Sequence, residues 1–78
     1  MLVDVGKIIM QRRKQLRITQ PTLAELADIH VNTLYRIERN EANPTVHLLE
    51  KLLDVLGMEI KIEVKKTEGI NENSQSLL

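Results

Sequence analysis

Few side chains in this 78-residue sequence have the types and spacing that catalysis or metal binding requires. The two histidines, His30 and His47, are far apart, and no acidic residues or cysteines stand near them at metal-ligand spacing. The sequence contains no cysteine, so it offers neither a thiol nucleophile nor a disulfide framework. It also lacks a Ser/His/Asp context and a glycine-rich phosphate loop. We therefore expect no enzyme, no metal site and no cofactor.

Length and composition exclude further classes. A chain this short forms one domain with a small core, for which a partner subunit is a common source of stability. No apolar run approaches the roughly 20 residues that span a bilayer, and the first residues lack the basic region of a signal peptide. We therefore expect a cytoplasmic protein with no membrane partner. A single aromatic residue, Tyr35, argues against a base-stacking platform for RNA or single strands.

The formal net charge is zero, but the charges are unevenly distributed. Residues 1–44 contain seven Lys/Arg and five Asp/Glu, a balance of +2, whereas residues 45–78 contain four and six, a balance of −2. The segment 7–17 carries only basic charges: Lys7, Arg12, Arg13, Lys14 and Arg17. The basic half of the chain is also the half that contains the motif described below.

Hydrophobic spacing and capping residues predict a mainly α fold with four helices. Asp4, Thr19 and Thr45 can each cap the start of a helix, and the helix after Thr45 ends at Gly57. A further helix over about residues 31–39 follows a short turn at residues 28–30. Its capping position holds His30, which is a poorer cap, so the pattern leaves the geometry of that turn open.

After Gly57 the hydrophobic period changes from 3.6 to 2, which predicts one half-buried C-terminal β-strand. Its apolar residues alternate with charged ones and are Met58, Ile60, Ile62 and Val64. The polar residues from Thr67 onward are typical of a disordered tail. The predicted organisation is therefore a domain over 1–57, a dimerisation strand over 58–66 and a tail over 67–78.

Two short helices joined by a three-residue turn suit a helix-turn-helix. The residues around them strongly resemble the Xre family, which includes the lambdoid phage repressors. The resemblance covers roughly residues 4–57 and rests on an ordered set of segments: 5–9, 12–16, 19–20, 23–24, 33–39 and 43–45. It implies a four- to five-helix lambda-repressor-like domain that binds double-stranded operator DNA and represses transcription.

The resemblance also implies which residues contact DNA. In the family the third helix lies in the major groove, with its first turn facing base edges. Asn32 and Arg36 then bond adenine and guanine, and Val31 touches a thymine methyl group. Gln20, Thr33 and Tyr35 are the residues expected to contact backbone phosphates. For each of these residues the alternative is an exposed side chain without a role in binding.

Two charged residues match an ion pair that links the first and third helices of the lambdoid repressors. These residues are Arg13 and Glu38, and their pairing would orient the third helix; the alternative is two unrelated surface charges. The family's three usual glycines are replaced here by Arg17, Asp28 and Asn40. Asp and Asn tolerate a left-handed backbone, whereas a left-handed Arg17 costs on the order of 1 kcal/mol.

The last third of the chain suggests a homodimer. The fourth helix carries two apolar stripes, of which only one is needed for the domain core. One consists of Leu49, Leu53 and Leu56, and the other of Leu48, Leu52 and Val55. A single strand exposes its backbone hydrogen-bonding groups, and no other segment of this chain looks like its partner. The same strand of a second copy, antiparallel across a two-fold axis, would pair with it and place two recognition helices roughly 34 Å apart.

A helix-turn-helix followed directly by Gly57–Ile62 and a polar tail is similar to the HipB-type antitoxins. This narrower resemblance implies a nucleoid-associated, autoregulating antitoxin of a toxin-antitoxin operon, with a kinase-like toxin as a partner. Two alternatives stay open. The first is a stand-alone Xre-type repressor without a toxin, and the second is a protein-interaction module that has lost DNA binding.

Overall fold

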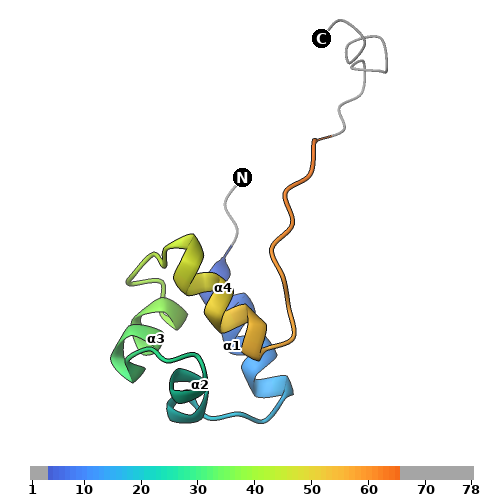
Figure 1. Cartoon of the computed structure of the whole chain (residues 1–78). Helices are drawn as coiled ribbons and strands as arrows, with labels where there is room; N and C mark the ends of the chain where they lie inside the picture. Colours follow the sequence, from blue (N-terminus) through green and yellow to red (C-terminus); the bar gives the residue numbers. More distant parts are fainter. Residues whose placement is uncertain (1–3, 66–78) are drawn as a thin grey trace, which may run out of the picture.

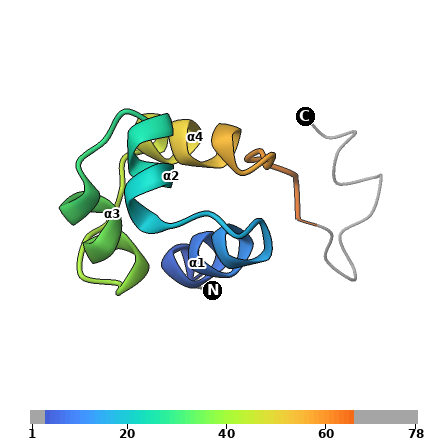
Figure 2. The same ribbon diagram turned by 90° about the horizontal axis from the view of Figure 1, so that it is seen from below.

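The computed structural model describes residues 4–65, and within them the chain forms four helices, in agreement with the sequence analysis. They are α1 (Val5–Gln15), α2 (Gln20–Leu26), α3 (Val31–Glu38) and α4 (Val46–Val55). α3 packs on α1 and α2, and α4 packs on α2 (Figure 1). Seen from below, α1 lies on the opposite side of the domain from α4 (Figure 2).

The core is built from apolar side chains of all four helices and their ends. Its buried members are Ile9, Leu23, Ala24, Ala27, Leu34, Ile37, Leu52, Leu53 and Leu56. The expectation that α4 carries one stripe for the core and one that lacks cover is wrong. Leu52 and Leu56, from different stripes, are both 0% exposed, and Leu48, Leu49 and Val55 pack partly buried against the same core.

The predicted caps are present at three of the four helix starts. Side-chain oxygens of Asp4, Thr19 and Thr45 accept backbone N–H groups at distances of 2.9, 3.3 and 3.1 Å. His30 makes no such side-chain bond. Its backbone is nevertheless extended, with φ −69° and ψ 138°, much like that of Thr45 at −69° and 162°. The turn before α3 therefore has the ordinary geometry of a helix start without the capping bond.

All four helices end in the same way, with one residue in the left-handed conformation. These residues have φ of 59°, 57°, 62° and 71° and are Arg17, Asp28, Asn40 and Gly57. In each case the N–H of the next residue bonds to a carbonyl five positions back, at 2.8 to 3.1 Å. The replacements at the family's glycine positions thus keep the left-handed turn.

A close approach of α1 to the end of α3 depends on Gly6, which is buried. A Cβ atom at this position would overlap the carbonyl oxygen of Ile37. The absent side chain therefore lets the two helix backbones nearly touch.

The predicted C-terminal strand does not form within one copy of the chain, and no strand occurs among residues 4–65. Met58 still packs on the core, with its N–H bonded to Leu53 O at 2.8 Å. Beyond it the chain leaves the domain as the orange segment of Figure 1. Ile60, Ile62 and Val64 are 40%, 96% and 87% exposed, because no second strand lies beside them. The tail predicted over 67–78 lies outside the described residues.

Candidate nucleic-acid interface

α2, the turn at residues 27–30 and α3 form the helix-turn-helix unit. Backbone bonds close the turn: Ala27 N–H to Leu23 O at 2.9 Å, and Ile29 N–H to Ala24 O at 2.9 Å. Leu23 and Ala24 of α2 are buried together with Leu34 of α3. The side chains that face away from this contact are therefore held by a fixed helix pair.

The exposed face of α3 brings together most of the residues predicted to contact DNA. Val31 and Tyr35 are 38% and 45% exposed, and Asn32 and Arg36 are exposed as well. Thr33 is only half-buried, whereas Leu34 and Ile37 turn into the core. Residues three or four apart share one side of a helix, so Asn32, Tyr35 and Arg36 form one polar surface.

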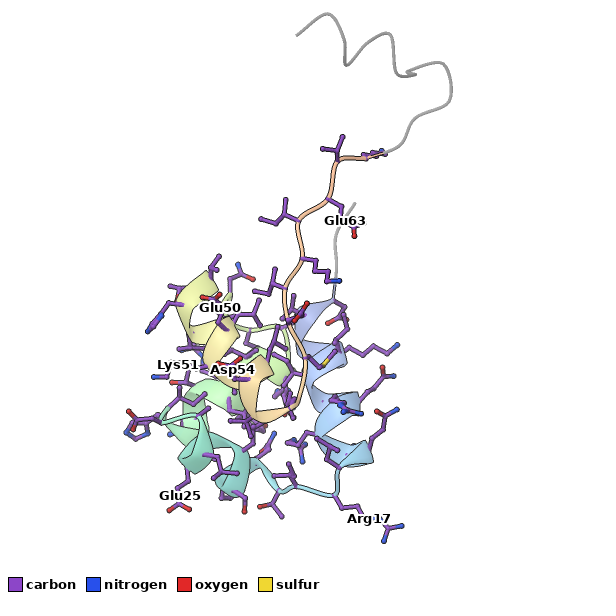
Figure 3. All side chains as sticks on the ribbon, turned by 45° about the vertical axis from the view of Figure 1, so that its right-hand side comes forward. Arg17, Glu25, Glu50, Lys51, Asp54 and Glu63 are labelled. Carbon is purple, nitrogen blue, oxygen red and sulfur yellow. The ribbon has the colours of Figure 1, made fainter. Side chains whose placement is uncertain are left out.

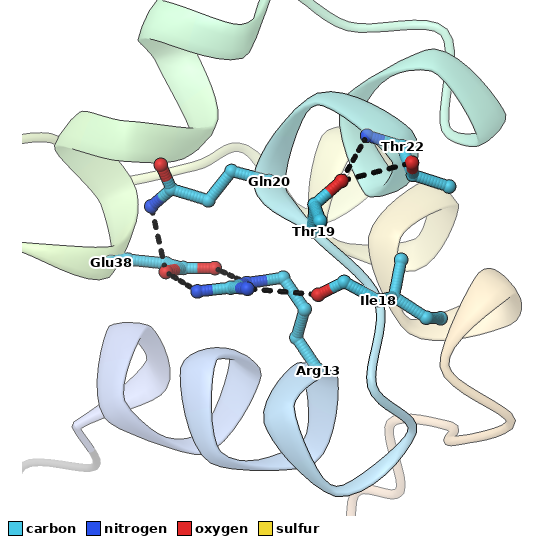
Figure 4. A network of polar contacts seen from close by, with 6 residues as sticks. All are labelled: Arg13, Ile18, Thr19, Gln20, Thr22 and Glu38. Carbon is cyan, nitrogen blue, oxygen red and sulfur yellow. Dashed lines mark hydrogen bonds and ion pairs between the residues drawn. The ribbon is translucent and has the colours of Figure 1, made fainter.

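A buried ion pair fixes α3 against α1, as the family resemblance implied (Figure 4). Arg13 Nε and Nη2 donate to the two carboxylate oxygens of Glu38 at 2.8 and 3.0 Å. Arg13 Nη1 donates to Ile18 O at 2.9 Å. The side chains are 10% and 2% exposed. This bidentate pair is a short, directional link that sets the angle of α3.

Gln20 joins this network instead of pointing freely into solvent. Its Nε2 donates to Glu38 Oε1 at 2.9 Å, so α2 is tied to α3 and α1 through one carboxylate (Figure 4). An amide nitrogen carries two N–H donors, and this bond uses one of them. The second donor remains for the phosphate contact predicted from the sequence.

Arg39 is a basic residue of this surface that the sequence analysis did not select. It follows α3 directly, one turn after Tyr35, and its guanidinium lies 5.2 Å from the centre of the Tyr35 ring. Its Nε also donates to the Glu41 carboxylate at 3.1 Å. The hydrogen bond that Arg39 donates to the Glu41 carboxylate is the main cause that raises the pKa of Arg39 above its usual value. The i, i+4 spacing from Tyr35 was the signal that could have identified Arg39.

Glu41 contacts the second arginine of the surface as well. Arg36 Nη2 donates to the Glu41 carbonyl oxygen at 3.3 Å, a long and exposed bond. Both arginines are therefore held by the loop after α3 in the unbound protein. Neither contact is buried, so exchange for a phosphate or a base requires little desolvation.

Not every basic residue of segment 7–17 is available to a polyanion. Arg12 Nε donates to Leu56 O at 3.0 Å and holds α1 to the end of α4. With Arg13 in the buried pair, two of the five basic side chains serve the fold. Lys7, Lys14 and Arg17 stay exposed.

The described part of the chain offers neither a metal site nor a membrane-spanning helix. Residues 4–65 contain no group of three His, Cys, Asp or Glu side chains suited to a metal ion. None of the helices in this range is long and apolar enough to cross a membrane.

Comparison with known proteins gives the family. The sequence model of the helix-turn-helix family matches residues 9–62. A putative HTH-type transcriptional regulatory protein of Methanococcus maripaludis is 38% identical over 66 residues, which are 85% of this chain and 18% of that protein. The immunity repressor protein of Bacillus phage phi105 is 35% identical over 70 residues, 90% of this chain and 49% of the repressor. This chain thus spans about a fifth and about half of these two relatives.

Solved structures agree with this assignment. The biofilm master regulator SinR, crystallised in complex with DNA, is 38% identical with a TM-score of 0.68, over 70% of this chain and 89% of that chain. A chain of the SinR–SinI complex is 31% identical with a TM-score of 0.69, over 94% and 73% of the two chains. These relatives are regulators rather than enzymes, as expected, and they give no support to the narrower HipB-type resemblance. The chain therefore belongs to the helix-turn-helix family of transcriptional regulators, in the Xre group that includes phage repressors.

Proposed function

We propose that this chain is a sequence-specific transcriptional repressor that inserts α3 into the major groove of double-stranded DNA. The observation that carries the proposal is the exposed polar face of α3, held at a fixed angle by the buried Arg13–Glu38 pair. A fixed helix is what base recognition needs, because its side chains must meet base edges in one register. The DNA complex of SinR and the repressor name of the phage relative support the same function.

Asn32 and Arg36 are the residues that select bases in this proposal. Both are exposed and one turn apart, so they reach neighbouring positions in the groove. Asn bonds adenine and Arg bonds guanine through paired hydrogen bonds, and Val31 at the helix start offers a methyl contact to thymine. Arg36 gives up only its exposed bond to the Glu41 carbonyl.

Phosphate contacts hold the helix in register and come from residues around it. Gln20 presents its second amide N–H while Glu38 holds the first. Tyr35 and Thr33 contribute hydroxyl groups, although half-buried Thr33 has the smaller reach. Such contacts carry no sequence information and set the orientation on the duplex.

The test is selection of binding sites from a random duplex library by the purified protein, followed by affinity measurements at several salt concentrations. We expect an enriched sequence whose binding weakens steeply with salt. The matched control is Arg36→Ala, which should no longer select one of the enriched positions. Failure of the unmodified protein to bind any duplex in a salt-dependent way would favour a protein-interaction module instead.

We further infer that the repressor acts as a homodimer, which the exposed segment 59–65 supports. A second protein partner is a separate candidate, since one similar solved structure is the SinR–SinI protein complex. The antitoxin role stays a prediction from the sequence. Co-purification of this chain with the product of a neighbouring kinase-like reading frame would support that role over a stand-alone repressor.

A further inference from the structure

The segment from residue 59 to residue 65 has hydrogen-bonding groups and apolar side chains without partners. Among residues 4–65, no backbone hydrogen bond involves this segment. Glu59 and Lys61 lie on one side of it, with Lys61 Nζ 3.9 Å from Glu59 Oε1. Ile60, Ile62 and Val64 alternate with these charges and are exposed. The segment thus already has the two-sided pattern of a strand.

We propose that two copies of this chain pair these segments as an antiparallel ribbon in which Ile62 lies directly opposite Ile62 of the second copy. The two-fold axis then passes midway between these two residues, which we call an axis at Ile62. The proposal rests on the homodimer of the proposed function but not on its DNA binding. Alternation restricts the choice of register, because a shift by one residue would set apolar side chains opposite charged ones. The residue at the centre of the ribbon must therefore lie opposite its own copy, not opposite the copy of its neighbour in sequence.

Charge complementarity selects Ile62 among the candidate centres. With the axis at Ile62, Lys61 lies opposite Glu63 of the second copy, and Glu59 opposite Lys65. Two-fold symmetry repeats each pair, so every charged residue from 59 to 65 meets an opposite charge. Cross-strand pairs of opposite charge stabilise an antiparallel sheet, and like charges destabilise it.

The neighbouring registers satisfy fewer charges. An axis at Lys61 places Glu59 opposite Glu63, and an axis at Glu63 places Lys61 opposite Lys65. Both arrangements oppose like charges. An axis at Ile60 keeps only the pairing of Glu59 with Lys61, and an axis at Val64 keeps only that of Glu63 with Lys65. The alternation of charges therefore favours one register.

The apolar side of the ribbon has a surface to cover. A groove of about 360 Å³ lies between α1, α4 and the start of the segment, with Ile8, Leu49 and Ile60 in its lining. In the proposed register Val64 of the second copy stands opposite Ile60, at the edge of this groove. The groove thus gives the ribbon a layer to pack on, which an isolated pair of strands needs for stability.

A single-cysteine variant tests the position of the axis. The native chain has no cysteine, so Ile62→Cys introduces one thiol per copy. Directly opposite residues in an antiparallel pair have Cα atoms about 4.5–5.5 Å apart, within the range of a disulfide. We expect mild oxidation to give a covalent dimer. Val64→Cys is the matched control. In the proposed register Val64 lies opposite Ile60 of the second copy, so the two thiols of this variant are four residues, or about 13 Å, apart along the ribbon. Faster cross-linking of Val64→Cys, or none by either variant, would overturn the proposal.

Charge reversal tests the pairs themselves, by sedimentation in the absence of DNA. Lys61→Glu and Glu63→Lys should each raise the dimer dissociation constant by about tenfold, because each creates two like-charge pairs. The double variant should return it close to the native value. Glu25→Lys is the matched control, since Glu25 on α2 lies far from Glu63 (Figure 3).

The other outcomes contradict the register. Weakening by Lys61→Glu alone would place the axis at Ile60, and weakening by Glu63→Lys alone would place it at Val64. A native chain that stays monomeric at tens of micromolar would overturn the dimer itself. These substitutions are exposed and outside the core, so helical circular dichroism should not change. Because no DNA is present, failure here and failure of duplex binding are separate results.

Discussion

Glu38 is the residue on which three parts of the domain converge, since it accepts from Arg13 of α1 and from Gln20 of α2 while belonging to α3. A buried pair of this kind adds little net stability compared with apolar residues of similar size. Removal of one partner, however, leaves a buried charge without compensation. The pair therefore matters more for the orientation of α3 than for the free energy of folding.

The burial of this pair has a consequence for unfolding. Glu38→Ala should lower the free energy of unfolding by about 3–5 kcal/mol, because the Arg13 guanidinium stays buried alone. The double variant Arg13→Met/Glu38→Leu should recover most of that loss while weakening DNA binding. Urea denaturation measures the free energy of unfolding of both variants, with Arg39→Ala as the exposed control. An effect of Glu38→Ala no larger than that of the control would contradict the burial of the pair.

Substitutions on α2 and α3 should separate phosphate contacts from base contacts. Arg36→Ala and Asn32→Ala should each weaken binding to the selected site by about 1–3 kcal/mol and relax the choice of one base pair. Gln20→Ala should weaken all duplexes about equally. Fluorescence anisotropy on the selected site and on single-base variants of it provides the measurement. Unchanged affinity of Arg36→Ala would mean that α3 lies in the groove in a different register.

Glu41 should act against DNA binding, because its carboxylate holds Arg39 and its carbonyl holds Arg36. Glu41→Gln should free Arg39 for a phosphate, tighten binding to all duplexes severalfold and increase the salt slope by about one counterion. The matched control is Glu50→Gln, which removes an exposed carboxylate from α4. The role of Arg39 is refuted if the salt slopes of Glu41→Gln and the native chain coincide.

At the scale of helices, local signals were sufficient. Three capping side chains, the left-handed residues at the helix ends and the 3.6-residue period each depend on neighbours within a few positions. The Arg13–Glu38 pair joins residues that are 25 positions apart in the sequence, and only the family resemblance could predict it. The bond of Gln20 to Glu38 was not foreseen, because the angle between α2 and α3 decides it.

The C-terminal segment shows the opposite case. Its apolar and charged residues alternate as in a strand, but a strand exists only where another strand lies beside it. The sequence pattern cannot say whether that strand comes from the same chain. The prediction of an uncovered stripe on α4 failed for a related reason, since the pattern of one helix cannot show that side chains of both stripes pack in the same core.

Gly6 gives a test of the contact between α1 and α3. In an ordinary helix, alanine is favoured over glycine by about 1 kcal/mol. Here we expect Gly6→Ala to destabilise the domain by about 1–3 kcal/mol, because the added methyl group overlaps the Ile37 carbonyl oxygen. Thermal unfolding followed by circular dichroism measures the change. A more stable Gly6→Ala variant would show that the two helices lie farther apart in solution.

The whole molecule has no net charge, so long-range attraction to DNA is weak and affinity must come from contacts at short range. One copy offers only the eight residues of α3 for the proposed contact with the major groove. Two copies joined through residues 59–65 would bind both halves of a palindromic site, and the second contact would benefit from a high effective concentration. Dimerisation and tight operator binding are therefore coupled in this proposal.

Ile62→Asp separates these two properties, since it places two carboxylates opposite each other on the proposed axis and lies outside the core at 96% exposure. We expect affinity for a palindromic full site to fall by at least about 100-fold. Affinity for a half-site should not change, because α3 and its supporting network are untouched. Titration of both duplexes at nanomolar protein gives the comparison, with Glu25→Asp as a conservative control. An equal loss on the half-site would mean that the substitution damages the domain, and an unchanged full-site affinity would mean that repression by this protein does not require the ribbon.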